Sequence, residues 1–78
     1  MAKHIGFELW DTRADSLLAD FDTADEALDE VSAGVGRYGD RYTDHIALLA
    51  VGPMGSARQI AAGADLAARA RSRRRVRA

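Results

Sequence analysis

The first part of the chain alternates apolar and polar or small residues in two short runs. The first run covers residues 4–11, a polar turn follows at 11–15, and the second run continues to residue 22. Alternation of this kind is typical of half-buried strands, and a short polar link between two of them predicts an antiparallel hairpin. The apolar positions, which predict one apolar face, are Ile5, Phe7, Leu9, Leu17, Ala19 and Phe21.

A helical spacing replaces the alternation after Thr23. Thr23 and Glu26 have the spacing of a capping box, which predicts the start of a helix, and Gly39 is a typical C-terminal stop. The apolar positions between them fall on one stripe, so we expect the helix to pack against the sheet. These positions are Ala24, Ala27, Leu28, Val31, Val35 and Tyr38.

The third apolar segment, residues 46–51, is a continuous run bounded by turn residues. Such a run suits a strand that is buried on both faces, and therefore a central one. Gly52, Pro53 and Gly55 then predict a turn.

Residues 57–71 fit two descriptions. They can form a fourth strand at 58–63 followed by a short helix from Ala64 to Ser72, or one helix from Ala57 to about Arg71 that Gly63 interrupts. Ser56 and Gln59 have capping-box spacing, and periodicity alone favours the single helix slightly.

Together these elements predict an α+β domain with two layers in the order β-β-α-β-β-α. An antiparallel sheet carries one main helix and a C-terminal helix, and the alternative replaces the last strand and helix by one long helix. We expect a single domain over residues 1–71 and an arginine-rich flexible tail over 72–78.

Composition makes the predicted core thin. The chain has 78 residues, and although 47% are hydrophobic, 16 of them are alanine. Domains of this size are often completed by a disulfide, a metal or a partner. The chain has no cysteine, which excludes disulfides and thiolate zinc sites.

The net charge of −1 hides a strong asymmetry. Residues 1–44 carry eleven acidic residues against Lys3, Arg13, Arg37 and Arg41, a net charge of −7. Residues 57–78 carry seven arginines against Asp65, a net charge of +6. The sequence therefore predicts an acidic body with a basic C-terminal segment.

Two phrases of the sequence resemble known families. Trp10-Asp11-Thr12, followed by Phe21-Asp22-Thr23-Ala24-Asp25-Glu26-Ala27, is similar to small, mostly uncharacterised bacterial proteins. In these proteins a hairpin with a WDT turn leads into an FDTxxEA strand–helix junction. The resemblance covers residues 5–66 and implies a fourth strand, because the corresponding segment ends at a glycine placed like Gly63.

The same junction also resembles that of AP2-type DNA-binding domains, which read DNA through arginine and tryptophan side chains on the outer face of the sheet. The matching positions here are His4, Glu8, Trp10, Leu18, Asp20 and Asp22. Only Trp10 fits that type, and three carboxylates on this face would repel phosphate.

Candidate catalytic or metal-binding chemistry is sparse. His4 and His45 are the only imidazoles, neither has a motif neighbour, and no serine is paired with a base. The glycines at 34, 36 and 39 follow a predicted helix instead of a strand, so they do not make a dinucleotide-binding loop. We therefore expect no enzymatic activity, no cofactor, no metal and no small-molecule substrate.

Two surfaces remain as binding candidates. Trp10 and Leu18, on the outer face of the hairpin, predict a surface for a protein partner or a second copy of the chain. The alternative is nucleic-acid association through the basic C-terminus. Its residues are Arg69, Arg71, Arg73, Arg74, Arg75 and Arg77, which can instead pair with the acidic helix.

The leading expectation is thus a small non-enzymatic interaction module that self-associates or binds a protein. No apolar run reaches membrane-spanning length and no signal peptide opens the chain, so we expect a cytoplasmic protein without membrane contact. A secreted protein without cysteines is the alternative.

Overall fold

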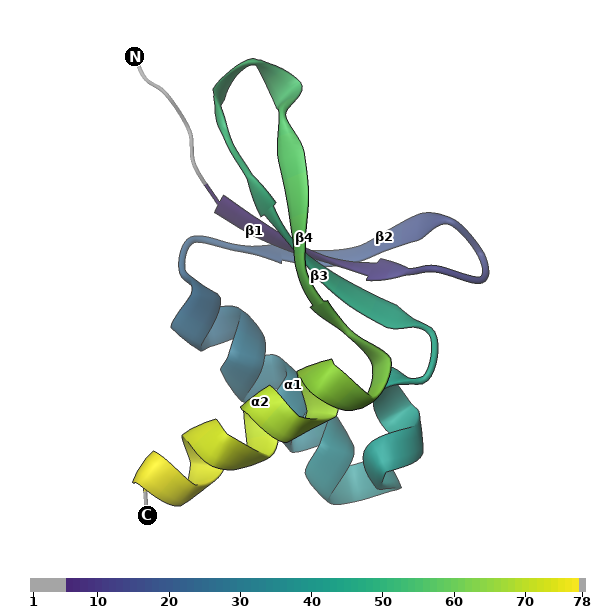
Figure 1. Cartoon of the computed structure of the whole chain (residues 1–78), viewed down its shortest axis with the longest axis vertical. Helices are drawn as coiled ribbons and strands as arrows, with labels where there is room; N and C mark the ends of the chain where they lie inside the picture. The colour runs from purple at the N-terminus through teal and green to yellow at the C-terminus, as the bar shows by residue number, and fades with distance from the viewer. Residues whose placement is uncertain (1–5, 78) are drawn as a thin grey trace.

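The computed structural model describes the backbone of residues 6–77 and the side chains of residues 6–73. Residues 6–77 form four strands, two main helices and two short 3-10 helices (Figure 1). Their bounds are β1 Gly6–Asp11, β2 Ser16–Phe21, α1 Ala24–Tyr38, η1 Asp40–Thr43, β3 Ile46–Val51, η2 Pro53–Gly55, β4 Ala57–Ala62 and α2 Gly63–Arg77. The order β-β-α-β-β-α confirms the predicted α+β fold class.

Residues 57–71, which the sequence allowed as a strand with a helix or as one helix, form the strand β4 and the first part of α2. In β4, Ala61 pairs with Leu48 of β3 and is buried, so this part of the chain belongs to the sheet. Gly63, at the junction with α2, has a φ of +56°, a left-handed conformation that glycine adopts at little cost. The sharp change of direction at Gly63 replaces the continuous helix that periodicity slightly favoured.

The four strands form one antiparallel sheet in the order β2-β1-β3-β4. The two inner strands pair Leu9 with Leu48, and both of these leucines are almost completely buried. β3 is therefore a central strand, as its continuous apolar sequence predicted.

A register shift in each outer strand changes which residues face which layer. Between Leu9 and Trp10 the pairing with β2 advances by an extra residue, so Leu9 pairs with Ala19 and Trp10 pairs with Leu17. The sequence predicted Leu17 on the same face as Leu9, and this was wrong because a bulge reverses the alternation. A second shift lies in the β3–β4 pairing, between Leu48 and Leu49.

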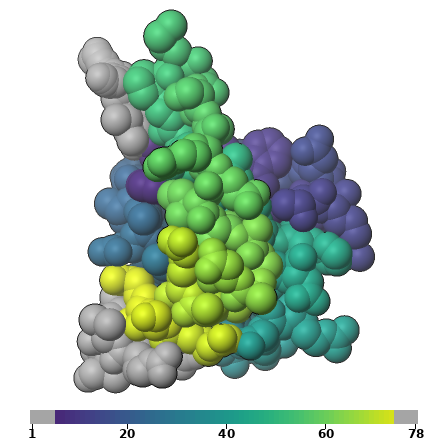
Figure 2. Space-filling view, viewed as in Figure 1, coloured from purple at the N-terminus to yellow at the C-terminus, as the bar shows by residue number. Residues whose placement is uncertain are grey.

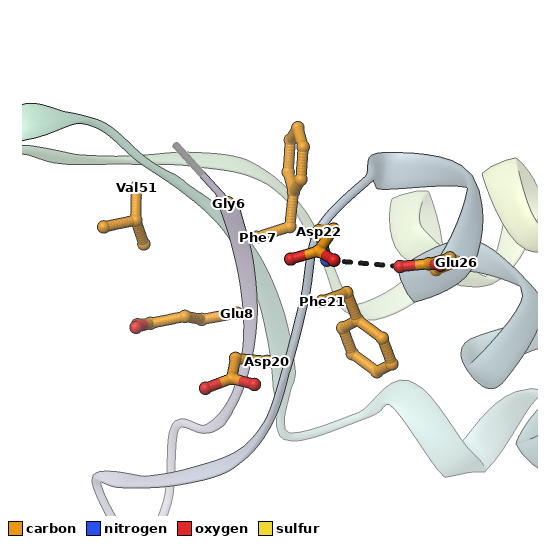
Figure 3. Close-up of a pocket in the computed structure, with 8 residues that line it drawn as sticks. All are labelled: Gly6, Phe7, Glu8, Asp20, Phe21, Asp22, Glu26 and Val51. Atoms are coloured by element: carbon orange, nitrogen blue, oxygen red, sulfur yellow. Dashed lines mark hydrogen bonds between the residues drawn. The ribbon is translucent and has the colours of Figure 1, made fainter. Parts of the chain in front are cut away.

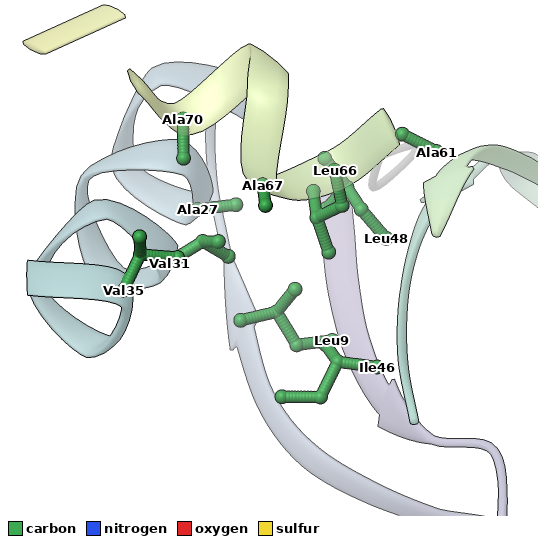
Figure 4. Packing of buried hydrophobic residues seen from close by; sticks show 10 residues of the cluster. All are labelled: Leu9, Ala27, Val31, Val35, Ile46, Leu48, Ala61, Leu66, Ala67 and Ala70. Atoms are coloured by element: carbon green, nitrogen blue, oxygen red, sulfur yellow. The ribbon is translucent and has the colours of Figure 1, made fainter. Parts of the chain in front are cut away.

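Both helices lie on one side of the sheet, and the tip of the β3–β4 hairpin projects away from them (Figures 1 and 2). The core is the layer between this face and the helices, with side chains from both helices meeting those of the strands (Figure 4). Its buried members are Leu9, Ala27, Val31, Val35, Ile46, Leu48, Ala61, Leu66, Ala67 and Ala70.

Local signals set the ends of α1. The Thr23 hydroxyl accepts a hydrogen bond from the Glu26 amide at 3.1 Å, and Gly39 ends the helix with a φ of +86°. The Glu26 carboxylate reaches back one residue further than a capping box predicts, to the Asp22 amide at 3.2 Å. Both ends of the predicted helix are confirmed.

Gly34, inside α1, has a packing role that the sequence did not indicate. It is buried, and a Cβ atom at this position would overlap the aromatic ring of Tyr42. A glycine inside a helix usually costs about 1 kcal/mol relative to alanine. Here the absence of a side chain at Gly34 allows the ring of Tyr42 to lie directly on the helix backbone.

Helix α2 passes through residue 72, where we expected a flexible tail to begin, and continues to Arg77. Ion pairs from its arginines to α1 and η1, described below, provide the physical reason. The expected boundary at residue 72 therefore does not coincide with the end of an element.

Candidate functional site

One face of the sheet is left open by the helices and carries a row of apolar side chains. The strand register places four residues across the sheet in this row, on the face opposite the core: Leu17, Trp10, Ala47 and Ala62. Leu17 is 46% exposed, and Trp10 is partly buried. We call these four residues the open-face row.

Trp10 is fixed in place on this face. Its indole Nε1 donates a hydrogen bond to a carboxylate oxygen of Glu8 at 2.7 Å. Trp10, Ala47 and Leu49 also line a shallow pocket of about 350 Å³ that ends at the β1–β2 turn. The open face therefore carries an aromatic side chain, oriented by a hydrogen bond, beside a shallow pocket.

The two predicted partner-binding residues are separated by the bulge. Leu18 is 50% exposed but is the extra residue of β2, and Leu17 takes the place across from Trp10. Sequence reasoning named Trp10 and missed Leu17, because simple alternation assigned Leu17 to the core.

A second pocket, of about 380 Å³, lies where β1, β2 and α1 meet and is strongly acidic (Figure 3). Glu8 and Asp20 project from the same side of the hairpin, whereas Phe21 points toward the helices. The carboxylates around it are those of Glu8, Asp20, Asp22 and Glu26. Within the described part of the chain, no three side chains of His, Cys, Asp or Glu are placed to hold a metal ion.

The C-terminal arginines that the structure describes are paired with the protein's own acidic residues. Arg73 contacts Asp29 at 2.9 Å and Asp25 at 3.4 Å, both in α1. Arg71 contacts Asp40 of η1 at 2.5 Å, and Arg69 contacts Asp65 one turn earlier in α2 at 3.3 Å.

The contacts of Arg71 and Arg73 join α2 to the acidic half of the molecule. Hydrogen bonding to Asp29 raises the pKa of Arg73, with Asp25 adding to the effect. Three of the six predicted nucleic-acid-binding residues, Arg69, Arg71 and Arg73, thus form ion pairs with acidic residues of the same chain at the protein surface. The side chains of Arg74, Arg75 and Arg77 lie outside the described residues.

The two histidines do not form a site that the structure describes, since His4 lies outside the described residues. His45 is exposed and lies in the loop before β3. Its carbonyl accepts a hydrogen bond from the Thr12 amide at 2.8 Å, which ties this loop to the β1–β2 turn.

That turn is held by Asp11. One oxygen of its carboxylate accepts hydrogen bonds from the amides of Arg13, at 2.9 Å, and Ala14, at 3.0 Å. The bond from Ala14 is the main cause that lowers the pKa of Asp11, and the charges of Arg13 and His45 add to it. Because the folded-state pKa lies below the unfolded one, this stabilisation is complete above the unfolded pKa and is lost as pH falls through the folded pKa.

A third pocket, of about 510 Å³, lies beside this turn and was not predicted from the sequence. Its lining comes from three separate segments: Arg13, Tyr38, Arg41, Tyr42, Asp44 and His45. The rings of Tyr38 and Tyr42 are stacked, with centroids 5.9 Å apart and planes 13° from parallel. Burial is the main cause that raises the pKa of Tyr42.

Among residues 6–77, no helix is both long and apolar enough to cross a membrane. Comparison with protein-family models, curated proteins and solved structures finds no match to this chain.

Proposed function

We propose that this protein is a non-enzymatic interaction module that self-associates through the open face of its sheet. The observation that carries the proposal is the position of Trp10, a large aromatic side chain on the face that neither helix covers. Leu17 lies beside it and is 46% exposed. Aromatic side chains on an uncovered face are typical of the central residues of interfaces.

The composition of the core supports a second copy as the occupant of this face. Four of the ten buried core residues described are alanines, which contribute little apolar area each: Ala27, Ala61, Ala67 and Ala70. A domain of this size and core composition has a small free energy of unfolding, and self-association adds apolar burial. In a twofold dimer the open-face row of each copy would pack on that of the other.

The outer strands favour association through the face over extension of the sheet. Both β2 and β4 contain a register shift, at Leu18 and Ile60, where one residue has no partner across the sheet. Bulges of this kind interrupt the row of backbone groups that another strand would need to pair with.

The test uses Trp10 as its own reporter, since it is the only tryptophan in the chain. Mass by light scattering and tryptophan emission are followed from about 1 µM to about 500 µM, a range that covers weak association. We expect the mass to rise toward that of a dimer, with a shift of the emission to shorter wavelength as Trp10 is buried.

Leu17→Lys is the decisive variant, because it places a charge in the open-face row without removing the reporter. It should remain monomeric throughout the range. Met54→Lys is the matched control, since Met54 is fully exposed at the tip of the β3–β4 hairpin. A monomer mass at every concentration, or equal loss of association in both variants, would contradict the proposal.

Nucleic-acid association through the C-terminal arginines is the competing proposal. It has to rely on Arg74, Arg75 and Arg77 or break the ion pairs of Arg69, Arg71 and Arg73. Anisotropy of a labelled duplex at low salt tests it. Binding that weakens steeply with salt, and that is lost when Arg74, Arg75 and Arg77 are all changed to Gln, would favour this function.

A further inference from the structure

The pocket beside the β1–β2 turn gathers positive charge within the acidic half of the protein. The first 44 residues contain three arginines besides Lys3, and all three lie around this pocket. Arg13 and Arg41 line it, and the guanidinium of Arg37 lies 5.9 Å from the ring centroid of Tyr38. His45 also lines it, and Asp44 is its only acidic lining residue.

Arg13 and Arg41 differ from the described arginines of α2 in forming no direct ion pair with a described carboxylate. Among the described side chains, the ion pairs involve Arg69, Arg71 and Arg73, and no carboxylate lies within ion-pair distance of Arg13 or Arg41. Two guanidinium groups that line one pocket without carboxylate partners are suited to an anion, above all to phosphate, whose oxygens accept paired hydrogen bonds.

The second component is the stack formed by Tyr38 and Tyr42. Tyr42 is held from below, because its ring lies on the backbone of α1 at Gly34. Tyr38 stacks on Tyr42, has the guanidinium of Arg37 over its ring and is still 64% exposed, so part of its aromatic surface is available at the pocket. Bases stack favourably on surfaces of this kind.

The segments that carry these groups are held before any ligand arrives. Asp11 fixes the turn that bears Arg13, and the Thr12 amide bonds to the His45 carbonyl. In η1, the Tyr42 amide bonds to the Gly39 carbonyl at 3.0 Å, and the hydroxyl of the fully buried Thr43 bonds to the Asp40 carbonyl. Figure 2 shows the β1–β2 turn and the segment around η1 as neighbours along one side of the molecule.

We propose that this pocket binds a nucleoside monophosphate, with the phosphate held by Arg13 and Arg41 and the base stacked on Tyr38. The pocket volume of about 510 Å³ lies within the range of small-ligand sites. This site is independent of the proposed self-association, because none of its lining residues belongs to the open-face row.

Three compounds distinguish the contribution of the phosphate from that of the base: adenosine 5′-monophosphate, ribose 5-phosphate and adenosine. Calorimetry measures affinity, and amide chemical shifts locate the site. We expect the monophosphate to bind tightest and to shift the amides of residues 12–14 and 42–45. Ribose 5-phosphate should bind more weakly, and adenosine most weakly.

Variants assign the contacts. Changing both Arg13 and Arg41 to Gln should weaken binding of the monophosphate and of ribose 5-phosphate by about tenfold or more, since each charged hydrogen-bonding group is lost. Tyr38→Leu should lower affinity for the monophosphate toward that of ribose 5-phosphate and leave the latter unchanged. Arg58→Gln, an exposed arginine of β4, is the matched control and should bind as the unmodified protein does.

The variants alter exposed side chains, and circular dichroism confirms that each is folded before its affinity is compared. The proposal is overturned if the monophosphate shows no binding at about 1 mM, where even weak specific ligands occupy their sites. It is equally overturned if the arginine double variant binds as well as the control, or if the monophosphate and ribose 5-phosphate bind equally.

Discussion

Leu9 and Trp10 are neighbours in β1 and face opposite sides of the sheet. Leu9 is 2% exposed and lies under both helices, in a row that continues through Leu48 and Ala61. Trp10 belongs to the open-face row, on the face of the sheet that neither helix covers, although its side chain is larger than that of Leu9. The helix-covered face thus combines leucine, isoleucine and phenylalanine side chains of the strands with alanines of α2, while the one tryptophan lies on the uncovered face.

This difference shows how an alanine-rich helix can complete a small domain. Leu66, Ala67 and Ala70 of α2 are almost fully buried, so α2 lies close to α1 and to the sheet. Close packing of small side chains gains contacts but little apolar area for each residue. We therefore expect the covered face to tolerate size changes poorly and the open face to tolerate them well.

The largest effect should come from a pair of substitutions in β1. Leu9→Ala removes a buried side chain and should lower the free energy of unfolding by about 2–5 kcal/mol, as cavity-forming changes do. Trp10→Ala should cost less in dilute solution, because Trp10 is only partly buried in the monomer.

Denaturant unfolding at two protein concentrations makes this comparison sharper. The loss for Leu9→Ala should not depend on concentration, whereas the loss for Trp10→Ala should grow as the protein self-associates. If both variants lost the same free energy of unfolding at both protein concentrations, Trp10 would be as buried in the monomer as Leu9, and the contrast between the two faces would be wrong.

An intermediate effect is expected in α2. Ala70→Leu forces a large side chain between the two helices and should lower the free energy of unfolding by about 1–3 kcal/mol. Ala68→Leu, two positions earlier on the exposed side of the same helix, is the control and should change stability by less than about 0.5 kcal/mol. Thermal unfolding measures both, and a destabilised Ala68→Leu variant would place the contact face of α2 elsewhere.

The smallest effect concerns the ion pairs that fasten α2 over the covered face. Arg73→Gln removes the contacts with Asp25 and Asp29 and should lower the unfolding temperature slightly at low salt. The difference from the unmodified protein should shrink as salt is added, because exposed charges are screened. If the difference in unfolding temperature stayed the same in high salt, Arg73 would stabilise the protein through packing of its aliphatic part and not through its charge.

Local signals in the sequence were sufficient for the order β-β-α-β of the first four main elements, whereas residues 57–71 fitted both a strand with a helix and a single helix. The alternation around Phe7, the capping pair of Thr23 and Glu26, and the stop at Gly39 each act within a few residues, so they can be read without tertiary information. The bulge at Leu18 has no comparable signature, because it depends on how an edge strand follows the twist of its neighbour. That is why Leu17 was assigned to the core and not to the open face.

Long-range contacts account for the rest. The passage of α2 through residue 72 depends on Arg73 meeting Asp29, 44 positions earlier in the chain. Gly34 looks like a weak point of a helix until the ring of Tyr42 is placed on it. Likewise Arg13 and Arg41 share a pocket only because the β1–β2 turn and η1 meet in three dimensions, so the sequence indicated neither residue as part of a site.

The strand order also has a consequence for how the chain reaches its structure. β1–β2 and β3–β4 are each joined by a short turn, so both hairpins close small loops and can form quickly. The central pairing of β1 with β3 has to enclose β2, α1 and η1 before Leu9 meets Leu48. We expect the docking of the two hairpins to limit the folding rate, so that Leu48→Ala slows folding. Changes near the hairpin tips, which are already formed at that step, should also slow folding and alter the unfolding rate little.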